Sequence, residues 1–467
     1  MARDLEGRKV VVLGLARQGV ALVRYLSRKG ARITVSDLKP AEALEKEIDE
    51  LAGIAVDYHL GGHPIDLLEG ADLLCLSGGV PSDLPVVEEA RRRNMPVAND
   101  TQLFLEGTPA KVVGITGSSG KTTTTMLVGR MAFRAADAGR IRRAWVGGNI
   151  GNPLLGDVEG MQKDDLAVLE LSSFQLELVC SGVRVAAVLN ITPNHLDRHH
   201  TMEAYREAKA RILAFQAPED AAVLGWDSPE ARSLQTRVRG SCSFFRAGPK
   251  AWDGDGAYLD GGWIIVECGG KREPVVQREA VLLRGEHNLA NAVAACAIGA
   301  AAGIPAEILA EGIKGFRGVA HRLEFVAHCR AADWYNDSIA TAPERSIAAI
   351  RSFEEPIVLL AGGRDKKLPW DAWAELVRRR VDHVVLFGEA AELIRRALGK
   401  SRAGERPYTV DSVASIEAAV RKAAEVVQPG SVVLLSPGGT SYDAFKDFEE
   451  RGEAFRALVH AMKAEEA

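Results

Sequence analysis

The segment KVVGITGSSGKTTTT, residues 111–125, joins an apolar strand to a helix through a loop of glycine and serine. Backbone amides in such a loop, together with the N-terminus of the following helix, can bind phosphate groups. Lys121 is expected to contact the outer phosphates and Thr122 to hold Mg2+, with Thr123 close enough to assist. A purely structural turn needs no Gly-Lys-Thr. We therefore predict a site for ATP formed by Gly117, Ser118, Ser119, Gly120, Lys121, Thr122 and Thr123.

The spacing of this loop departs from the standard phosphate loop in one respect. Ile115 occupies the position of the first glycine, and Gly114 lies one residue too far upstream. The prediction therefore depends on the Gly-Lys-Thr triplet and on the strand and helix on either side of it.

Two further apolar segments, residues 166–172 and 185–191, are predicted strands that end in polar residues. The carboxyl ends of parallel strands meet at one edge of a sheet, so Glu170 is expected near the phosphate loop as a Mg2+ ligand. A solvated glutamate at a strand end is the alternative. His195 follows the second strand and could bind a second metal, although Mg2+ prefers oxygen and a single histidine is more often structural.

The rest of the chain repeats the alternation of strands and helices, so the predicted fold class is α/β with three domains. Residues 1–107 read as a small doubly wound, Rossmann-like domain. Residues 108–318 read as the ATP-binding domain, with a small antiparallel sheet appended between about 220 and 283. A glycine-rich hinge near residue 315 precedes a second Rossmann-like domain, 319–467.

Composition excludes several classes of function. The 467 residues carry a net charge of -5, and the basic residues are spread along the chain, which argues against a nucleic-acid partner. The six cysteines form no CxxC pair and are expected to be reduced, as in a cytoplasmic protein. The N-terminus lacks the apolar run of an export signal. The uncharged stretch 288–306 is too short to span a membrane and is predicted to be a core helix.

The first domain has two interpretations. Gly14-Leu-Ala-Arg-Gln-Gly19 resembles the GxGxxG turn of dinucleotide-binding domains, and Asp37 closes the next strand 18 residues after Gly19. Ala16 replaces the middle glycine, which makes the match imperfect. A nucleotide other than NAD could bind the same turn.

Five motifs occur in a fixed order: TGSSGKT, ELSSFQLE, LNITPNHLDRH, AYREAKARI and GEHNLAN. Together they resemble the Mur ligase superfamily, and ELSSFQLE is most similar to its D-glutamate-adding branch. The resemblance implies a cytoplasmic, monomeric enzyme of peptidoglycan synthesis that serves cell-wall biogenesis, cell shape and cell division. It would use ATP and two Mg2+ ions to join UDP-N-acetylmuramoyl-L-alanine to D-glutamate through an acyl phosphate.

The resemblance also implies roles for particular residues. Lys209 would be carbamylated and act as a metal ligand with Thr122, Glu170 and His195, and the catalytic set would be Lys121, His195 and Lys209. Further ATP contacts would come from Asn288, Asn291, Arg322 and Asp337. The UDP-sugar would contact Leu15, Ala16, Asp37, Lys39, Ser77, Gly78, Gly79 and Asn149. D-Glutamate would contact Lys366, Ser441, Tyr442 and Phe448.

The sequence departs from the family pattern in two places. Ile339 stands where many members have a lysine, so a cation is missing, and Arg345 or Lys367 could replace it. The loop Gly438-Gly439-Thr440 replaces the family's Ala-Cys-Ala. These departures leave open a nucleotide-sugar-binding regulator without catalysis. Within the ligase class, the alternatives are another Mur ligase or a folylpolyglutamate-type synthetase.

Overall fold

The computed structural model describes residues 3–151, 153–399 and 408–466, which fall into two compact units. The first unit comprises the chain up to residue 281 together with 286–315. The second comprises 282–285 and the chain from residue 316 onward. Among the described residues, no helix is both long and apolar enough to cross a lipid bilayer.

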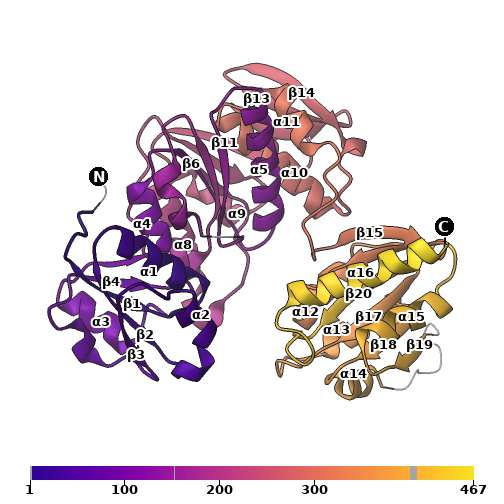
Figure 1. Ribbon diagram of the computed structural model, residues 1–467. Helices are drawn as coiled ribbons and strands as arrows, with labels where there is room; N and C mark the ends of the chain where they lie inside the picture. The colour runs from indigo at the N-terminus through magenta and orange to yellow at the C-terminus, as the bar shows by residue number, and fades with distance from the viewer. Residues whose placement is uncertain (1–2, 152, 400–407, 467) are drawn as a thin grey trace. The chain divides into compact units, whose positions relative to one another are not determined.

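The first unit begins with a parallel five-stranded sheet in the order β3-β2-β1-β4-β5 (Figure 1). Its strands are β1 (Lys9–Leu13), β2 (Arg32–Asp37), β3 (Val56–Leu60), β4 (Leu73–Leu76) and β5 (Val97–Asn99). Alternate residues of β1 face opposite apolar clusters, since Val10 and Val12 belong to one cluster and Val11 and Leu13 to another. Burial on both faces explains why the strand reads as a continuous apolar run.

Helices cover both faces of this sheet, as a doubly wound fold requires. They are α1 (Arg17–Arg28), α2 (Glu45–Asp49), α3 (Pro85–Arg92) and α4 (Asp100–Gly107). Leu22 and Leu26 of α1 pack on the Val10 face, while Val86 and Val87 of α3 pack on the opposite face. The predicted Rossmann-like architecture of this part is confirmed.

A nine-stranded mixed sheet follows in the order β14-β13-β12-β11-β10-β9-β6-β8-β7. Its strands are β6 (Lys111–Thr116), β7 (Ala144–Gly148), β8 (Leu166–Glu170), β9 (Val185–Val188), β10 (Ala221–Gly225), β11 (Ser241–Arg246), β12 (Gly256–Asp260), β13 (Trp263–Cys268) and β14 (Lys271–Gln277). The predicted antiparallel part is present as β12-β13-β14. It continues the central sheet, and β11 pairs in parallel with both β10 and β12, so within the range 220–283 the antiparallel pairing is confined to β12-β13-β14.

Seven helices of the described residues accompany this sheet: α5 (Lys121–Asp137), α6 (Ser173–Leu176), α7 (Leu196–His199), α8 (Met202–Ala214), α9 (Pro229–Ser233), α10 (Glu286–Ala301) and α11 (Ala306–Ile313). One apolar cluster runs from Val10 through Phe104 and Val112 to Val188. The N-terminal and central sheets therefore share a core. The division of this region into two domains at residue 107 stays a prediction, as does the boundary at 318.

The second unit contains a six-stranded sheet in the order β15-β16-β20-β17-β18-β19, in which only β15 is antiparallel. Its strands are β15 (Glu324–Cys329), β16 (Ala332–Asn336), β17 (Ile357–Gly362), β18 (His383–Phe387), β19 (Thr409–Ser412) and β20 (Val432–Gly438). Its helices are α12 (Pro343–Ile350), α13 (Asp371–Arg380), α14 (Ala391–Leu398), α15 (Ile416–Val426) and α16 (Phe448–Glu466).

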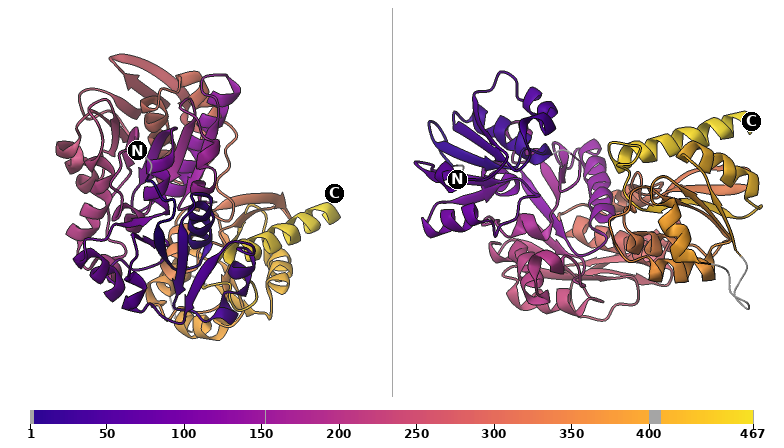
Figure 2. Two further views of the ribbon diagram at one scale, coloured as in Figure 1. Left: turned by 60° about the vertical axis from the view of Figure 1, so that its left-hand side comes forward. Right: turned by 90° about the horizontal axis from the view of Figure 1, so that it is seen from below.

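The helices of the second unit form a layer on each side of the sheet (Figure 2). Ile350 of α12 and Trp373 of α13 pack on one face, and Val420 of α15 and Phe455 of α16 pack on the other. This confirms the predicted Rossmann-like character of the C-terminal part. The loops after β16, β17 and β20 emerge at the same edge, because these three neighbouring strands are parallel.

Candidate active site

The predicted phosphate loop connects β6 to α5 in the first unit. Gly120 has a φ of 79°, a conformation that L side chains rarely adopt. The loop is held by Asn190, which lies two residues after β9. The Asn190 carbonyl oxygen accepts from the Ser118 amide and its Oδ1 accepts from the Ser119 amide, both at 2.9 Å. Two of the loop's amides are thus engaged by protein atoms, which fixes the loop's shape next to β9.

The N-terminal part of α10 lies against this loop. A Cβ at Gly120 would come within 2.2 Å of Asn291 Oδ1, so a larger residue there would have to displace the Asn291 side chain. Asn291 Nδ2 donates to Asn288 Oδ1 at 3.1 Å, and both side chains are buried. The structure therefore brings these two predicted ATP contacts to the phosphate loop from a distant part of the chain.

Two lysines meet at the carbonyl oxygen of Gly117. Lys121 Nζ donates to it at 3.0 Å and Lys209 Nζ at 2.9 Å. Lys209 is only 1% exposed, and its Nζ lies 4.6 Å from the centre of the Tyr205 ring. Burial, aided by the Lys121 charge and opposed by the Glu170 charge, lowers the pKa of Lys209 to about 7. The structure thus places a readily deprotonated amine beside the predicted phosphate site.

Glu170 is buried at the end of β8 and only one of its carboxylate oxygens is occupied. Oε1 accepts from Asn149 Nδ2 at 2.9 Å, whereas Oε2 is buried and has no hydrogen-bond partner among the described residues. An unsatisfied buried carboxylate oxygen is costly unless a cation binds it. The site therefore fits a metal ion. Asn149, a predicted contact of the UDP-sugar, lies here as a partner of Glu170.

His195 lies on the segment after β9 and has a φ of 53°. Its ring meets the Phe174 ring edge-on at 5.2 Å, and Phe174 in turn stacks on His199. No three His, Cys, Asp or Glu side chains of the described chain gather into a metal-binding group. A metal role for His195 therefore stays a prediction that requires the Thr122 hydroxyl, Glu170 and a modified Lys209 as the other ligands.

The glycine turn of the N-terminal sheet is organised by Asp37. Its Oδ2 accepts from the Leu15 amide at 2.7 Å and its Oδ1 from the Lys39 amide at 2.9 Å. Asp37 therefore fixes the shape of this turn, and each of its oxygens keeps a further lone pair for a hydroxyl or N–H group of a ligand.

A small cleft separates the N-terminal sheet from the central one within the first unit. Ser77 and Gly78 line it on one side, and Phe174, Gln175 and Arg198 on the other. The Gly78 amide donates to Gln18 Oε1 at 2.8 Å, which ties the cleft to the turn containing Leu15 and Ala16. Ser77 and Gly78 therefore lie next to the turn that contains Leu15 and Ala16.

In the second unit, Arg322 lies close enough to Asp337 for its positive charge to lower the pKa of that carboxyl. Asp337 is buried; its Oδ2 accepts from Ser436 Oγ at 2.8 Å and its Oδ1 from the Leu323 amide at 3.2 Å. Burial raises the pKa of Asp337 to about 7, against the opposing effects of Ser436, Leu323 and Arg322. These two predicted ATP contacts thus occupy one edge of the C-terminal sheet.

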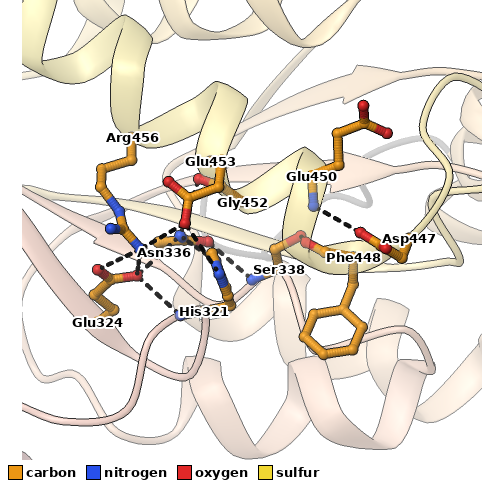
Figure 3. Close-up of polar contacts among 10 residues, drawn as sticks. All are labelled: His321, Glu324, Asn336, Ser338, Asp447, Phe448, Glu450, Gly452, Glu453 and Arg456. Carbon is orange, nitrogen blue, oxygen red and sulfur yellow. Dashed lines mark hydrogen bonds and ion pairs between the residues drawn. The ribbon is translucent and has the colours of Figure 1, made fainter. Parts of the chain in front are cut away.

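A polar network fixes this edge (Figure 3). Asn336 Nδ2 lies 3.1 Å from His321 Nδ1 and donates to the Gly452 carbonyl at 3.1 Å. Glu324 Oε2 accepts from the His321 amide at 2.8 Å. The network joins the turn before β15 to α16, and Ser338 Oγ adds a bond to the carbonyl of Phe448 at 2.8 Å.

The predicted amino-acid contacts come from the loops after β17 and β20, which are paired through Arg364 and Thr440. Lys366 Nζ donates to Thr341 Oγ1 at 3.3 Å. Ser441 is buried, whereas Tyr442 is exposed. The structure brings Lys366 and Ser441 to neighbouring loops and leaves Tyr442 in solvent.

Asn190, Tyr205 and Asn336 were missed by sequence reasoning. Asn190 lies near the end of the predicted strand 185–191, and the rule that selected Glu170 could have selected it. Tyr205 and Asn336 carry no such signal, because their roles depend on contacts with Lys209 and His321 across the fold.

Comparison with family models gives three matches along the chain. Residues 8–99 match the Mur ligase MurD-like N-terminal domain, 115–299 the Mur ligase middle domain, and 321–439 the Mur ligase glutamate ligase domain. Curated relatives match over the full length. UDP-N-acetylmuramoylalanine–D-glutamate ligase of Pelotomaculum thermopropionicum is 41% identical over 99% of this chain and 100% of its own. The enzyme of the same name from Anaeromyxobacter dehalogenans is 41% identical over 98% of both chains.

Solved structures show the same fold at lower identity. UDP-N-acetylmuramate-alanine ligase MurC of Thermotoga maritima superposes with a TM-score of 0.57 and 19% identity, covering 97% of this chain and 99% of that one. MurF ligase of Thermotoga maritima, solved in complex with ADP, gives a TM-score of 0.55 and 19% identity over both complete chains.

Proposed function

The chain belongs to the Mur ligase family, and from this premise we propose that it adds D-glutamate to UDP-N-acetylmuramoyl-L-alanine at the expense of ATP, in the synthesis of the peptidoglycan precursor. The observation that carries the proposal is the full-length similarity to curated ligases of this specificity. The site geometry supports it, because Lys121 and Lys209 meet at the predicted phosphate loop close to Glu170, and Lys366 and Ser441 lie on neighbouring loops of the second unit. The cytoplasm is the proposed location and a monomer the proposed state.

In the proposed reaction, the carboxylate of the UDP-linked substrate attacks the γ-phosphorus of ATP to give an acyl phosphate and ADP. Gly117 to Thr123 would hold the phosphates, with Lys121 compensating the charge that develops on them. Asn288 and Asn291 would contact the adenine, and Arg322 and Asp337 the phosphate and ribose.

The proposed metal ligands are Thr122, Glu170, His195 and carbamylated Lys209. Bound Mg2+ would neutralise charge on the phosphate oxygens and on the acyl phosphate. Glu170 Oε2 is suited to such a cation because it is buried and has no other partner among the described residues. Carbamylation would convert the Lys209 amine into a second anionic oxygen ligand, which suits Mg2+ better than nitrogen does.

The amine of D-glutamate then attacks the acyl carbon, and phosphate leaves as the amide forms. Lys366, Ser441, Tyr442 and Phe448 would hold the amino acid, whose two carboxylates require cationic and hydroxyl donors. The UDP-sugar would lie along the N-terminal turn, contacting Leu15, Ala16, Asp37, Lys39, Ser77, Gly78, Gly79 and Asn149.

The proposal is tested by phosphate release from Mg-ATP and UDP-N-acetylmuramoyl-L-alanine with D-glutamate, L-glutamate, L-alanine, L-lysine or no amino acid. Release that requires D-glutamate is the expected result. Phosphate release only with another amino acid would assign the enzyme a different amino-acid substrate. No release with any amino acid would favour a non-catalytic nucleotide-sugar-binding protein.

A further inference from the structure

Two cationic side chains lie at the turn that joins β16 to α12 in the second unit. Lys366 comes from the loop after β17 and donates to Thr341 Oγ1 at 3.3 Å. Arg345 comes from the first turn of α12, and its Nη1 donates to the carbonyl oxygen of Ile339 at 3.2 Å. Thr341 and Ile339 are two residues apart, so the fold brings both cations to one short stretch of backbone.

Neither cation at this turn forms an ion pair with a carboxylate of the described residues, although Arg345 lies close enough to Asp337 to lower the pKa of that carboxyl. Within the described residues, Lys366 and Arg345 have only the hydroxyl and the carbonyl oxygen named above as polar partners. Arg345 also lowers the pKa of Lys366, secondarily to burial, so the two positive charges are close enough to repel each other. Asp337 faces the same region, but burial raises its pKa to about 7 and it is only partly ionised at neutral pH. The turn therefore has an excess of positive charge, which a bound anion would relieve.

We propose that Arg345 is a second cation of the amino-acid site and that, together with Lys366, it selects an acceptor carrying two carboxylates. This inference rests on the proposed function, because it assigns one cation to each carboxylate of D-glutamate. The guanidinium group suits this role, since it can bind a carboxylate through two parallel hydrogen bonds. Its hydrogen bond to the Ile339 carbonyl uses only one of its five N–H groups, leaving others for a ligand.

The full-length Arg345→Gln variant tests the inference, with steady-state kinetics for D-glutamate, D-glutamine and ATP. Loss of one charge-assisted contact should raise the KM for D-glutamate about 10- to 100-fold. The kcat and the KM for ATP should stay within twofold of wild type, and the preference for D-glutamate over D-glutamine should fall. Arg345→Lys should recover part of the affinity, because it keeps the charge but not the planar fork.

Arg351→Gln is the matched control, since Arg351 is an exposed arginine just after the same helix, and melting temperatures check that all variants fold. An unchanged KM for D-glutamate in Arg345→Gln, or a rise confined to the KM for ATP, would overturn the inference and leave the proposed function intact. A wild-type protein without D-glutamate-dependent phosphate release would overturn the proposed function and this inference with it.

Discussion

Lys209 is a buried lysine whose amine is near its titration point at neutral pH, since burial lowers its pKa to about 7. CO2 adds only to a neutral amine, so carbamylation should become more favourable as the pH rises from 6 to 8. We expect protein equilibrated with 13C-bicarbonate at pH 8 to give a carbamate resonance in its 13C NMR spectrum. Ligase activity should increase with bicarbonate over the same pH range.

Replacement of the same residue provides the control for this resonance. Lys209→Ala should lose the signal and should lower kcat by roughly 100-fold or more, because one oxygen ligand of the proposed metal site is absent. Lys163→Ala, which removes an exposed lysine, should change neither the carbamate signal nor kcat. A carbamate signal that persists in Lys209→Ala would show that another amine is modified.

Asp337 makes the stability of the second unit depend on pH. Its folded-state pKa is about 7, above the ordinary value of 3.8, so the folded protein binds the proton more tightly than the unfolded chain does. Stability from this group is therefore greatest near pH 4 and is lost as the pH rises toward 7. Asp337→Asn cannot ionise, so its melting temperature relative to wild type should increase between pH 5 and pH 8. A difference in melting temperature that stays constant from pH 5 to pH 8 would contradict the raised pKa of Asp337.

At the level of elements, the close packing of α5 and α10 around the phosphate loop depends on Gly120. Gly120→Ala should raise the KM for ATP at least tenfold, because its Cβ would lie 2.2 Å from Asn291 Oδ1 and displace the side chain of this proposed adenine contact. Gly139, just beyond α5, has a similar φ of 67° but open space around it. Gly139→Ala should therefore cost only about 1–2 kcal/mol of backbone strain and leave ATP binding unchanged. Equal KM values for ATP in Gly120→Ala and Gly139→Ala would contradict the steric argument.

The elements that were predicted correctly are those with a strong local signal. The strand, loop and helix around Lys121 and the strand that ends at Glu170 were found from periodicity and turn residues alone. The parallel pairing of β11 was missed, because strand direction is set by neighbours in the sheet rather than by the strand's own residues. Tyr205 and Asn336 were missed for a similar reason, since each acts on a side chain that only the fold brings near. Arg345, in contrast, was named from the sequence as a possible replacement for the missing cation.

On the scale of the whole molecule, the distribution of apolar clusters predicts two unfolding transitions. The N-terminal and central sheets share one cluster, so they should unfold together, whereas the second unit has its own clusters on the two faces of its sheet. Segment 282–285 belongs to the second unit through Arg284, which donates to Tyr335 Oη at 2.7 Å.

Calorimetry with hydrogen exchange should resolve these transitions and assign each to its peptides. The phosphate loop lies in the first unit, so ADP at about 100 times its dissociation constant should stabilise that unit by roughly 2.7 kcal/mol through mass action. Peptides of the central sheet, including 111–125 and 185–191, should then gain protection from exchange together with those of the N-terminal sheet. If the central peptides were protected while the N-terminal ones opened at their original temperature, the two sheets would not form one cooperative unit, and a domain boundary near residue 107 would be favoured.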